Sequence, residues 1–409
     1  MLLISKRFKK TRILYIIVFL LFCLEYSYNF DDIIAFKFNV ISGAYYTNLG
    51  IGEPRQSKLF GFNLGYDYTW SCTISIVQPS ISNTRFVFEK QTRSIALYGD
   101  SRVTTGKQIV DNLTIEKRDG TMITLSDFIV YGISNTDISL SDSIGLGYKI
   151  EKAEDSFIGL LSNKVNHYRS FGFTSIEFNE GTFFEGGINE YIKEQYKIPL
   201  ECEVNRHYSY WGCDINHLKI GDIDYNTEYY AMFQTNQSQI SAPEDFLNKL
   251  DKSFFNSLIQ NNSCSVSIIS GKKYYSCQCN EINKIPDIII YFNDKGIKLT
   301  PKNLFEQYDM NCRFIINGQE GNNKHFVLGT YLLMDYVSYF DHEKHTISLF
   351  SKNEFEKLDF VKINSRRNNI LLLFLIILTI IICGVFCFGL MYIKIKQTSN
   401  VNILLKLIL

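Results

Sequence analysis

Residues 45–56 read Tyr-Tyr-Thr-Asn-Leu-Gly-Ile-Gly-Glu-Pro-Arg-Gln. Tyr45–Ile51 is a short run in which strand-favouring residues dominate, and the Gly and Pro that follow are typical of a turn. Comparable runs recur at Leu59–Phe62, Arg85–Phe88, Ser94–Tyr98, Lys107–Ile115, Ile288–Phe292 and Thr346–Phe350. Helices are favoured only at Glu154–Lys164, Glu244–Leu258 and Pro301–Phe305. The pattern predicts an all-β protein made of barrels or sandwiches rather than a parallel α/β sheet.

The charges of the chain are segregated along its length. The 409 residues contain 42 Lys+Arg and 42 Asp+Glu, but residues 1–30 carry a net charge of +4 and residues 366–409 carry +5. Residues 31–365 therefore carry −9. This acidic body disfavours nucleic-acid binding, which needs a basic face. A composition of 46% apolar and 15% aromatic residues excludes a disordered chain.

Both ends of the chain have membrane-related patterns. Five basic residues between Lys6 and Arg12 precede an apolar run, which predicts a secretory signal or an uncleaved signal anchor within residues 1–30. Residues 370–393 contain no charge and predict one transmembrane helix. Basic residues flank this span on both sides, so the N-terminal signal decides the orientation. We expect a secretory-pathway protein with a lumenal or extracellular body and a cytosolic tail, residues 394–409.

The body contains seven cysteines, and an exported protein uses such residues for disulfides. They are Cys72, Cys202, Cys213, Cys264, Cys277, Cys279 and Cys312. An odd number leaves at least one of them unpaired or paired between chains. The Cys-x-Cys spacing at 277–279 is not that of a zinc site, and the six histidines show no ligand spacing, so we expect no metal and no cofactor. Sequons at Asn112, Asn261 and Asn236 fit a secreted glycoprotein.

Residues 45–56 resemble the opening strand and turn of the pepsin-type aspartic proteases (peptidase family A1). Further landmarks of that family follow in order. They are Phe62–Gly65 with Trp70, the flap-like Tyr98-Gly99, Ser143–Gly147, Phe184–Ile188, Tyr210-Trp211, Ala231–Ser238, Ile285–Ile288, Phe326–Gly329 and Tyr339–Asp341. The resemblance implies a bilobal pepsin-like fold with lobes at residues 43–195 and 196–355. It also implies a disulfide between Cys279 and Cys312, for which Cys277 competes.

Asn63 and Gln234 stand where this family carries its two catalytic aspartates. Peptide hydrolysis there needs two carboxyl groups about 3 Å apart that share one proton. A carboxamide cannot accept a proton from water in that way. Leu64 also lacks the hydroxyl that Thr235 retains, and Asn236 replaces a glycine of the family pattern. We expect Asn63 and Gln234 to hydrogen-bond each other and the loop backbones. We also expect the loop around Asn236 to be buried, which would leave the Asn236 sequon unused.

Three functions remain open at this point. The first is a membrane-anchored, inactive pseudo-protease that binds a peptide or protein, with Gly65, Tyr98, Gly99 and Thr235 as candidate cleft and flap residues. The second is an active aspartic endopeptidase with a non-standard site, in which Asp67 supplies an acid. The third is a structural surface module whose cleft is filled.

Overall fold

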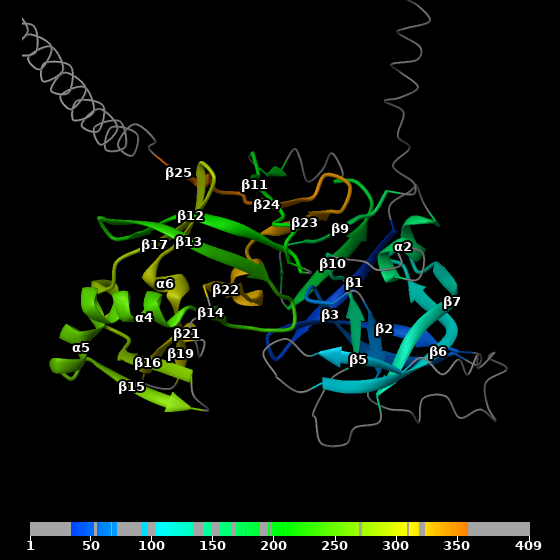
Figure 1. Ribbon diagram of the computed structural model, residues 1–409, viewed down its shortest axis with the longest axis horizontal. Helices are drawn as coiled ribbons and strands as arrows, with labels where there is room; N and C mark the ends of the chain where they lie inside the picture. The colour runs from blue at the N-terminus through cyan, green and yellow to red at the C-terminus, as the bar shows by residue number, and fades with distance from the viewer. Residues whose placement is uncertain are drawn as a thin grey trace, which may run out of the picture. The chain divides into compact units, whose positions relative to one another are not determined.

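The computed structural model describes residues 34–52, 55–66, 68–71, 92–96, 103–133, 142–148, 156–164, 168–174, 176–177, 179–188, 195–196, 198–208, 210–269, 272–308, 311–318 and 324–358 (Figure 1). The predicted signal, transmembrane segment and tail lie outside these ranges, as do Asp67, Cys72, Tyr98, Gly99 and the strand expected at Arg85–Phe88. Within these ranges, no helix has both the length and the apolar character needed to cross a membrane. The described residues up to Glu356 form one compact unit.

The largest sheet has 13 strands in the order β11-β24-β23-β9-β10-β1-β2-β3-β8-β4-β7-β6-β5. Their bounds are β1 Ile34–Ile41, β2 Ala44–Ile51, β3 Gln56–Asn63, β4 Thr69–Ser71, β5 Thr92–Ala96, β6 Val103–Glu116, β7 Met122–Ile133, β8 Ser143–Gly145, β9 Ser170–Phe173, β10 Glu180–Glu185, β11 Leu200–Glu203, β23 Val337–Asp341 and β24 Thr346–Phe350. Strands β11, β23 and β24 come from the predicted C-terminal lobe. The two predicted lobes therefore share one continuous sheet.

The C-terminal part contains two further sheets, in the orders β21-β14-β22-β13-β12-β17-β18-β25 and β15-β16-β20-β19. Their bounds are β12 Gly212–Ile220, β13 Ile223–Phe233, β14 Ile240–Ala242, β15 Cys264–Ile269, β16 Lys272–Gln278, β17 Ile288–Phe292, β18 Lys295–Leu299, β19 Phe305–Tyr308, β20 Asn311–Phe314, β21 Ile316–Gly318, β22 His325–Leu328 and β25 Glu356–Lys357. The mostly β architecture expected from the sequence is confirmed, and its sheets are consistent with the pepsin-like fold that the resemblance implies.

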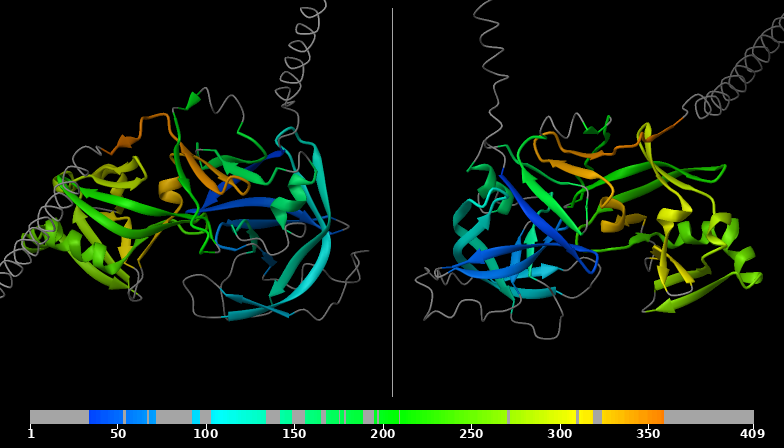
Figure 2. Two further views of the ribbon diagram at one scale, coloured as in Figure 1. Left: turned by 45° about the horizontal axis from the view of Figure 1, so that its top comes forward. Right: turned by 180° about the vertical axis from the view of Figure 1, so that it is seen from behind.

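The helices of the described residues are short. They are α2 Phe157–Ser162, α4 Glu244–Leu250, the π-helical turn η4 Asp251–Phe255, α5 Asn256–Gln260, the 3₁₀ turn η5 Ile282–Lys284, α6 Pro301–Leu304 and α7 Thr330–Leu333. The Ser156 hydroxyl caps α2 by accepting from the Gly159 N–H at 3.0 Å. Helices α4 and α5 lie beside the four-stranded sheet, α5 in contact with β15 (Figures 1 and 2).

A two-residue hairpin loop joins β1 to β2 and places the N-terminal strands against the second half of the chain. Ser42 and Gly43 both have positive φ, 51° and 76°, as in the type I′ turns that fit the twist of a hairpin. A Cβ atom on Gly43 would lie 2.3 Å from Cβ of Ser238. The Thr330 hydroxyl also donates to the Gly43 carbonyl. Glycine at this position allows the hairpin to contact residues of both segments.

The core between the strands is rich in phenylalanine. Phe36 lies 4.7 Å from Phe183 between ring centroids, and Phe62 stacks on Phe183 at 5.2 Å. Trp70 and Trp211 are both buried. The Trp211 indole N–H donates to the Leu146 carbonyl at 2.7 Å, which ties the start of β12 to the segment after β8. Such aromatic burial is the main stabilising contribution in a core of this kind.

Six of the seven body cysteines form three disulfides, Cys202–Cys213, Cys264–Cys277 and Cys279–Cys312. The pairing predicted for Cys279 is therefore confirmed, and its competitor Cys277 bonds Cys264 instead. The seventh, Cys72, lies outside the described residues. Disulfides of this number are consistent with a protein of the secretory pathway or an extracellular body.

Candidate functional site

The first loop of the candidate site follows β3. Strand β3 runs parallel to β8, with Phe62 opposite Ile144 and Asn63 opposite Gly145. The Leu146 N–H donates to the Asn63 carbonyl at 2.8 Å and extends this pairing. The chain then returns as β4 on the other side of β8, where Trp70 lies antiparallel to Ser143. Asn63 therefore stands at the buried end of β3, where the chain crosses over β8.

The second loop repeats this arrangement. Strand β13 runs parallel to β22, with Met232 opposite Val327 and Phe233 opposite Leu328. The Gln234 N–H donates to the Leu328 carbonyl at 3.0 Å, and β14 returns antiparallel to β22. The orders β3-β8-β4-β7 and β13-β22-β14-β21 are thus equivalent. Asn63 and Gln234 therefore occupy corresponding places in an internal structural repeat.

The two loops touch each other directly. The Thr235 hydroxyl, on a fully buried side chain, donates to the Phe62 carbonyl at 2.8 Å. The Tyr45 N–H donates to the Thr235 carbonyl at 3.0 Å. A Cβ atom on Gly65 would lie 2.8 Å from Gln234 Nε2 and 3.2 Å from Asn63 Oδ1. Glycine at position 65 therefore leaves the space in which the two amide side chains approach the first loop.

The two amides have separate partners. Asn63 is 2% exposed, and its Oδ1 accepts the Gly65 N–H at 2.8 Å. Gln234 is 3% exposed, its Nε2 donates weakly to Met232 Sδ at 3.6 Å, and its buried Oε1 has no partner among the described residues. The expected hydrogen bond between Asn63 and Gln234 is therefore wrong, because Asn63 Oδ1 accepts from Gly65 and Gln234 Nε2 donates to Met232, whereas the expected bond of Asn63 to the loop backbone is confirmed. A buried carbonyl oxygen without a donor costs about 1–3 kcal/mol, so Gln234 Oε1 lowers the stability of the fold as it stands.

The neighbours of the two amides differ in burial. Leu64 is buried in the hydrophobic core and supplies no hydroxyl. The side-chain hydrogen bond between the loops is therefore the one that Thr235 donates to the Phe62 carbonyl. Asn236 is exposed, although Gln234 and Thr235 beside it are buried. The expectation that this part of the loop is buried is therefore wrong, and burial gives no reason for the Asn236 sequon to remain unused.

An aromatic cluster follows the first loop, and the sequence patterns did not assign it. It joins Tyr66, Tyr68, Trp70 and Tyr131, with ring centroids 5.4–6.1 Å apart. Its signal in the sequence is the alternation of aromatic residues at 66, 68 and 70. This alternation brings three rings to the same side of the chain just after Asn63.

Behind the second loop, a chain of hydrogen bonds involves side chains from three segments. It runs from Gln237 Nε2 to Ser241 Oγ (2.8 Å), from Ser241 Oγ to Asn317 Oδ1 (2.7 Å) and from Asn317 Nδ2 to Gln239 Oε1 (2.6 Å). Spacing in the sequence gives no signal for this network, because Asn317 arrives from a distant strand.

The described residues include no cluster of His, Cys, Asp or Glu that could hold a metal ion. Burial raises the pKa of the Tyr45 phenol beside the loops, so this group stays neutral. The candidate residues Tyr98 and Gly99, and the acid at Asp67, lie outside the part of the chain that is described. The described part of the meeting point between the loops thus holds a pair of neutral amides, and the buried Oε1 of Gln234 has no partner among the described residues.

Thr235→Val is expected to destabilise the protein by about 1–3 kcal/mol, because it removes a buried donor from the Phe62 carbonyl without changing the side-chain volume much. Urea unfolding of the full chain measures this. Thr235→Ser keeps the hydroxyl and is the matched control. Equal stability of the Val variant and the wild type would show that this contact contributes nothing.

The repeated crossing loops and the shared sheet define a protein of the aspartic-protease class. The profile of the eukaryotic aspartyl protease family matches residues 44–352, so the chain belongs to that family. Among curated proteins, it is similar to plasmepsin I of Plasmodium falciparum. The two are 25% identical over 327 residues, which covers 76% of this chain and 69% of the relative. The plasmepsin I of a second isolate of the same organism matches with the same values.

Proposed function

We propose that this family member is a pseudo-protease, which binds a peptide or protein segment at the two loops without hydrolysing it. One observation carries the proposal: the residues at the corresponding ends of β3 and β13, Asn63 and Gln234, are both carboxamides and both buried. These are the positions that would hold the two catalytic acids. The replacement is therefore symmetric, one amide in each repeat.

The chemistry of the amides supports an inactive site. In an aspartic protease, mutual repulsion separates the pKa values of two close carboxyl groups, so that one acts as a base and the other as an acid. Amide groups have no such protonation equilibrium near neutral or acidic pH. General acid–base catalysis supplies a rate enhancement of about 10²–10⁴-fold per group. With both carboxyl groups absent, both contributions are lost.

Two features support binding rather than a purely structural module. Gln234 Oε1 is a buried acceptor without a partner among the described residues, and a backbone N–H of an extended peptide would satisfy it. The aromatic cluster of Tyr66, Tyr68, Trp70 and Tyr131 lies just beyond the first loop, and its tyrosines are only partly buried. Aromatic side chains with this exposure offer apolar contact to a ligand side chain at a low entropic cost.

The full-length chain is expected to leave a nine-residue peptide library uncleaved at pH 3–6 while retaining some of its members in ultrafiltration. Mass spectrometry reads both results in one sample. Gln234→Met removes the buried Oε1 acceptor and keeps a similar side-chain volume. It is expected to weaken the binding of the best retained peptide about tenfold or more and to stabilise the fold. Gln278→Met, on β16 and outside the two loops, is the control.

Each rival function has its own outcome in this assay. Pepstatin-sensitive cleavage that disappears in Asp67→Asn identifies an active enzyme with a non-standard site. Absence of any retained peptide, together with equal stability of Gln234→Met and wild type, identifies a structural module with a filled cleft. Either result overturns the pseudo-protease proposal.

We also propose that the protein is a single-pass membrane protein of the secretory pathway, glycosylated at Asn112 and Asn261. The uncharged run at 370–393 and the basic-apolar start at 1–30 support this. Asn261 is exposed at the end of α5, where a glycan has room.

Alkaline carbonate is expected to leave the full chain in the membrane pellet and to release a chain that ends at Phe360, because only the full chain contains the uncharged run at 370–393. Asn112→Gln and Asn261→Gln are each expected to remove one glycan. Each variant should therefore lose less mass on glycosidase treatment than the wild type does. Extraction of the full chain, or the same mass loss as the wild type in both variants, would contradict this topology.

A further inference from the structure

Three cysteines form a row across three neighbouring strands of the four-stranded sheet. In the antiparallel register, Cys264 on β15 lies opposite Cys277 on β16, and Cys277 lies opposite Cys312 on β20. Residues that face each other across such strands project to the same side of a sheet. Cys279 follows Cys277 by two residues and is bonded to Cys312. Four cysteines are therefore gathered at one place, and Cys277 is at the centre of the row.

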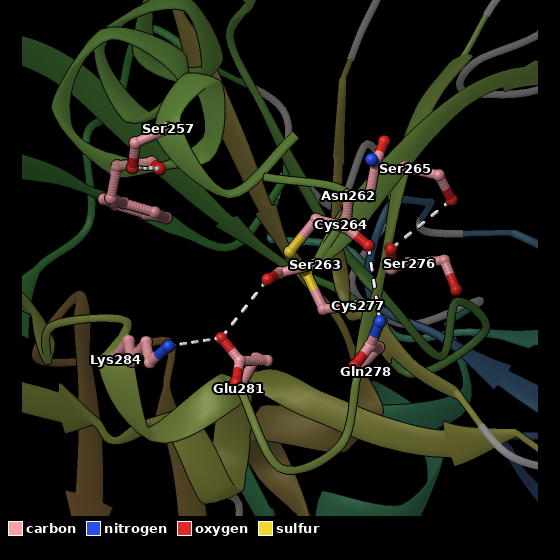
Figure 3. The surroundings of a disulfide bond; sticks show 11 residues. Ser257, Asn262, Ser263, Cys264, Ser265, Ser276, Cys277, Gln278, Glu281 and Lys284 are labelled. Carbon is pink, nitrogen blue, oxygen red and sulfur yellow. Dashed lines mark hydrogen bonds and ion pairs between the residues drawn. A yellow bond between two sulfur atoms is a disulfide. The ribbon is translucent and has the colours of Figure 1, made fainter. Parts of the chain in front are cut away.

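Cys277 has two potential partners of suitable geometry. It is bonded to Cys264, as Figure 3 shows. Directly opposed residues in antiparallel strands have Cα atoms about 4.5–5.5 Å apart, which is within the range of about 4.4–6.8 Å that disulfides use. The register alone therefore permits a Cys277–Cys312 bond without a shift of strands. Cys312 instead bonds Cys279, two positions further along the chain from Cys277.

The surrounding hydrogen bonds hold β15 and β16 together independently of their disulfide. The Gln278 N–H donates to the Ser263 carbonyl at 2.9 Å, and its side-chain amide donates to the Asn262 carbonyl at 3.3 Å. The Ser263 hydroxyl donates to Glu281 at 3.3 Å, and Lys284 pairs with the same carboxylate (Figure 3). Opening of the Cys264–Cys277 bond therefore leaves the strand register in place.

We propose that Cys264, Cys277, Cys279 and Cys312 form a thiol-exchange site that reacts with a small thiol such as glutathione. The thiolate of the small molecule attacks Sγ of Cys279; a mixed disulfide forms, the Cys279–Cys312 bond breaks, and Cys312 leaves as a thiolate. Cys312 then attacks Sγ of Cys277, and the Cys277–Cys264 bond breaks. Cys264 leaves as a thiolate and takes up the proton released by the small thiol. The number of disulfides is unchanged, so no oxidant is required.

Burial decides where the small thiol enters. Cys279 is partly exposed, whereas Cys264, Cys277 and Cys312 are buried. The product carries a free thiol at Cys264, the first residue of the edge strand β15. Beyond it, Val266, Ile268 and Ile269 are exposed, Ile268 by 76%. Exchange therefore breaks the buried Cys264–Cys277 disulfide and leaves a mixed disulfide on Cys279. It also creates a free thiol at Cys264, beside an exposed apolar strand edge.

The first test treats the full-length chain with reduced glutathione, traps thiols with iodoacetamide, and maps the cysteines by mass spectrometry without reduction. The expected product has glutathione on Cys279, an alkylated Cys264 and a Cys277–Cys312 bond. Cys202–Cys213, which is buried and distant from the row in sequence, is the internal control and is expected to stay bonded. Alkylated Cys279 and Cys312 beside an intact Cys264–Cys277 bond would overturn the proposal.

The second test uses Cys279→Ser in a Cys72→Ser background and needs no added thiol. Trypsin then places Cys264, Cys277 and Cys312 on three different peptides, because Lys272, Lys273, Lys284 and Lys302 separate them. The proposal expects Cys277 linked partly to Cys264 and partly to Cys312, each at roughly a tenth or more, since bonds of similar geometry differ little in stability. Exclusive Cys264–Cys277 pairing in the folded variant would contradict it.

Discussion

Glu185→Gln is expected to stabilise the protein at pH 8 by about 4 kcal/mol and to leave its stability at pH 4 nearly unchanged. Glu185 is the last residue of β10, opposite Ile34 on β1 and Phe171 on β9. Its side chain is 0% exposed, and neither carboxyl oxygen has a hydrogen-bond partner in the described part of the chain. Burial without a partner disfavours the charged form and raises the pKa of the Glu185 carboxyl to about 8.

The sign of the effect follows from proton binding in the two states. The pKa of Glu185 in the folded protein is raised above the ordinary value of 4.5. Between pH 4.5 and 8 the folded state therefore holds a proton that the unfolded state releases, so the stability of the fold decreases as pH rises through this window. Glutamine does not titrate, so the stability of the variant does not decrease in this way as pH rises.

Urea unfolding of wild type and variant at pH 4, 6 and 8 measures the difference. The matched control is Glu180→Gln, on the same strand but exposed and only loosely paired with Lys37 at 3.8 Å. That substitution is expected to change the free energy of unfolding by less than about 1 kcal/mol at each pH. A parallel pH dependence of Glu185→Gln and wild type would show that Glu185 does not titrate in this range.

The double variant Asn63→Asp, Gln234→Asp is expected to cleave peptides at acidic pH at least about 100-fold faster than wild type, in a reaction that pepstatin inhibits. The equivalent strand crossings place the two residues at corresponding positions, and Gly65 leaves room where their side chains meet. Two carboxyl groups there would share a proton and regain the acid and base roles. The existing contact from Thr235 to the Phe62 carbonyl supports the required loop geometry.

Each single substitution is the natural control for the double variant. A lone aspartate has no partner with which to share a proton, so Asn63→Asp and Gln234→Asp alone are expected to remain inactive. Adding Leu64→Thr to the double variant supplies the second inter-loop hydroxyl and is expected to increase the rate further. A folded double variant that cleaves nothing between pH 3 and 6 would show that these residues are not at the catalytic positions.

Local sequence signals predicted much of the fold. The predicted strands at Ile288–Phe292 and Thr346–Phe350 agree with β17 and β24 at both ends, because both are largely apolar runs between turns. The helix expected at Glu244–Leu258 is confirmed in position. It is divided by the π-helical turn at Asp251–Phe255, where Asp251 contacts Lys273 and Tyr275 on β16. A local sequence pattern cannot predict contacts between residues that lie so far apart along the chain.

The features that the sequence did not predict depend on distant partners. Spacing cannot distinguish the partners of Cys277, and its bond to Cys264 is established only by the three-dimensional structure. The isolation of Gln234 Oε1 and the exposure of Asn236 depend on how the loops fold in three dimensions, with Gly65 and Met232 beside Gln234. The sequence thus predicted that Asn63 and Gln234 come together near Gly65, and it did not predict their hydrogen bonds.

A crystal structure of the full-length chain grown at pH 4 with a statine-containing peptide tests the central claim most directly. The side chains closest to the statine hydroxyl are predicted to be the amides of Asn63 and Gln234, with no two carboxyl groups facing each other between the loops. Two carboxyl groups about 3 Å apart at that point, from any residues of the chain, would contradict the account.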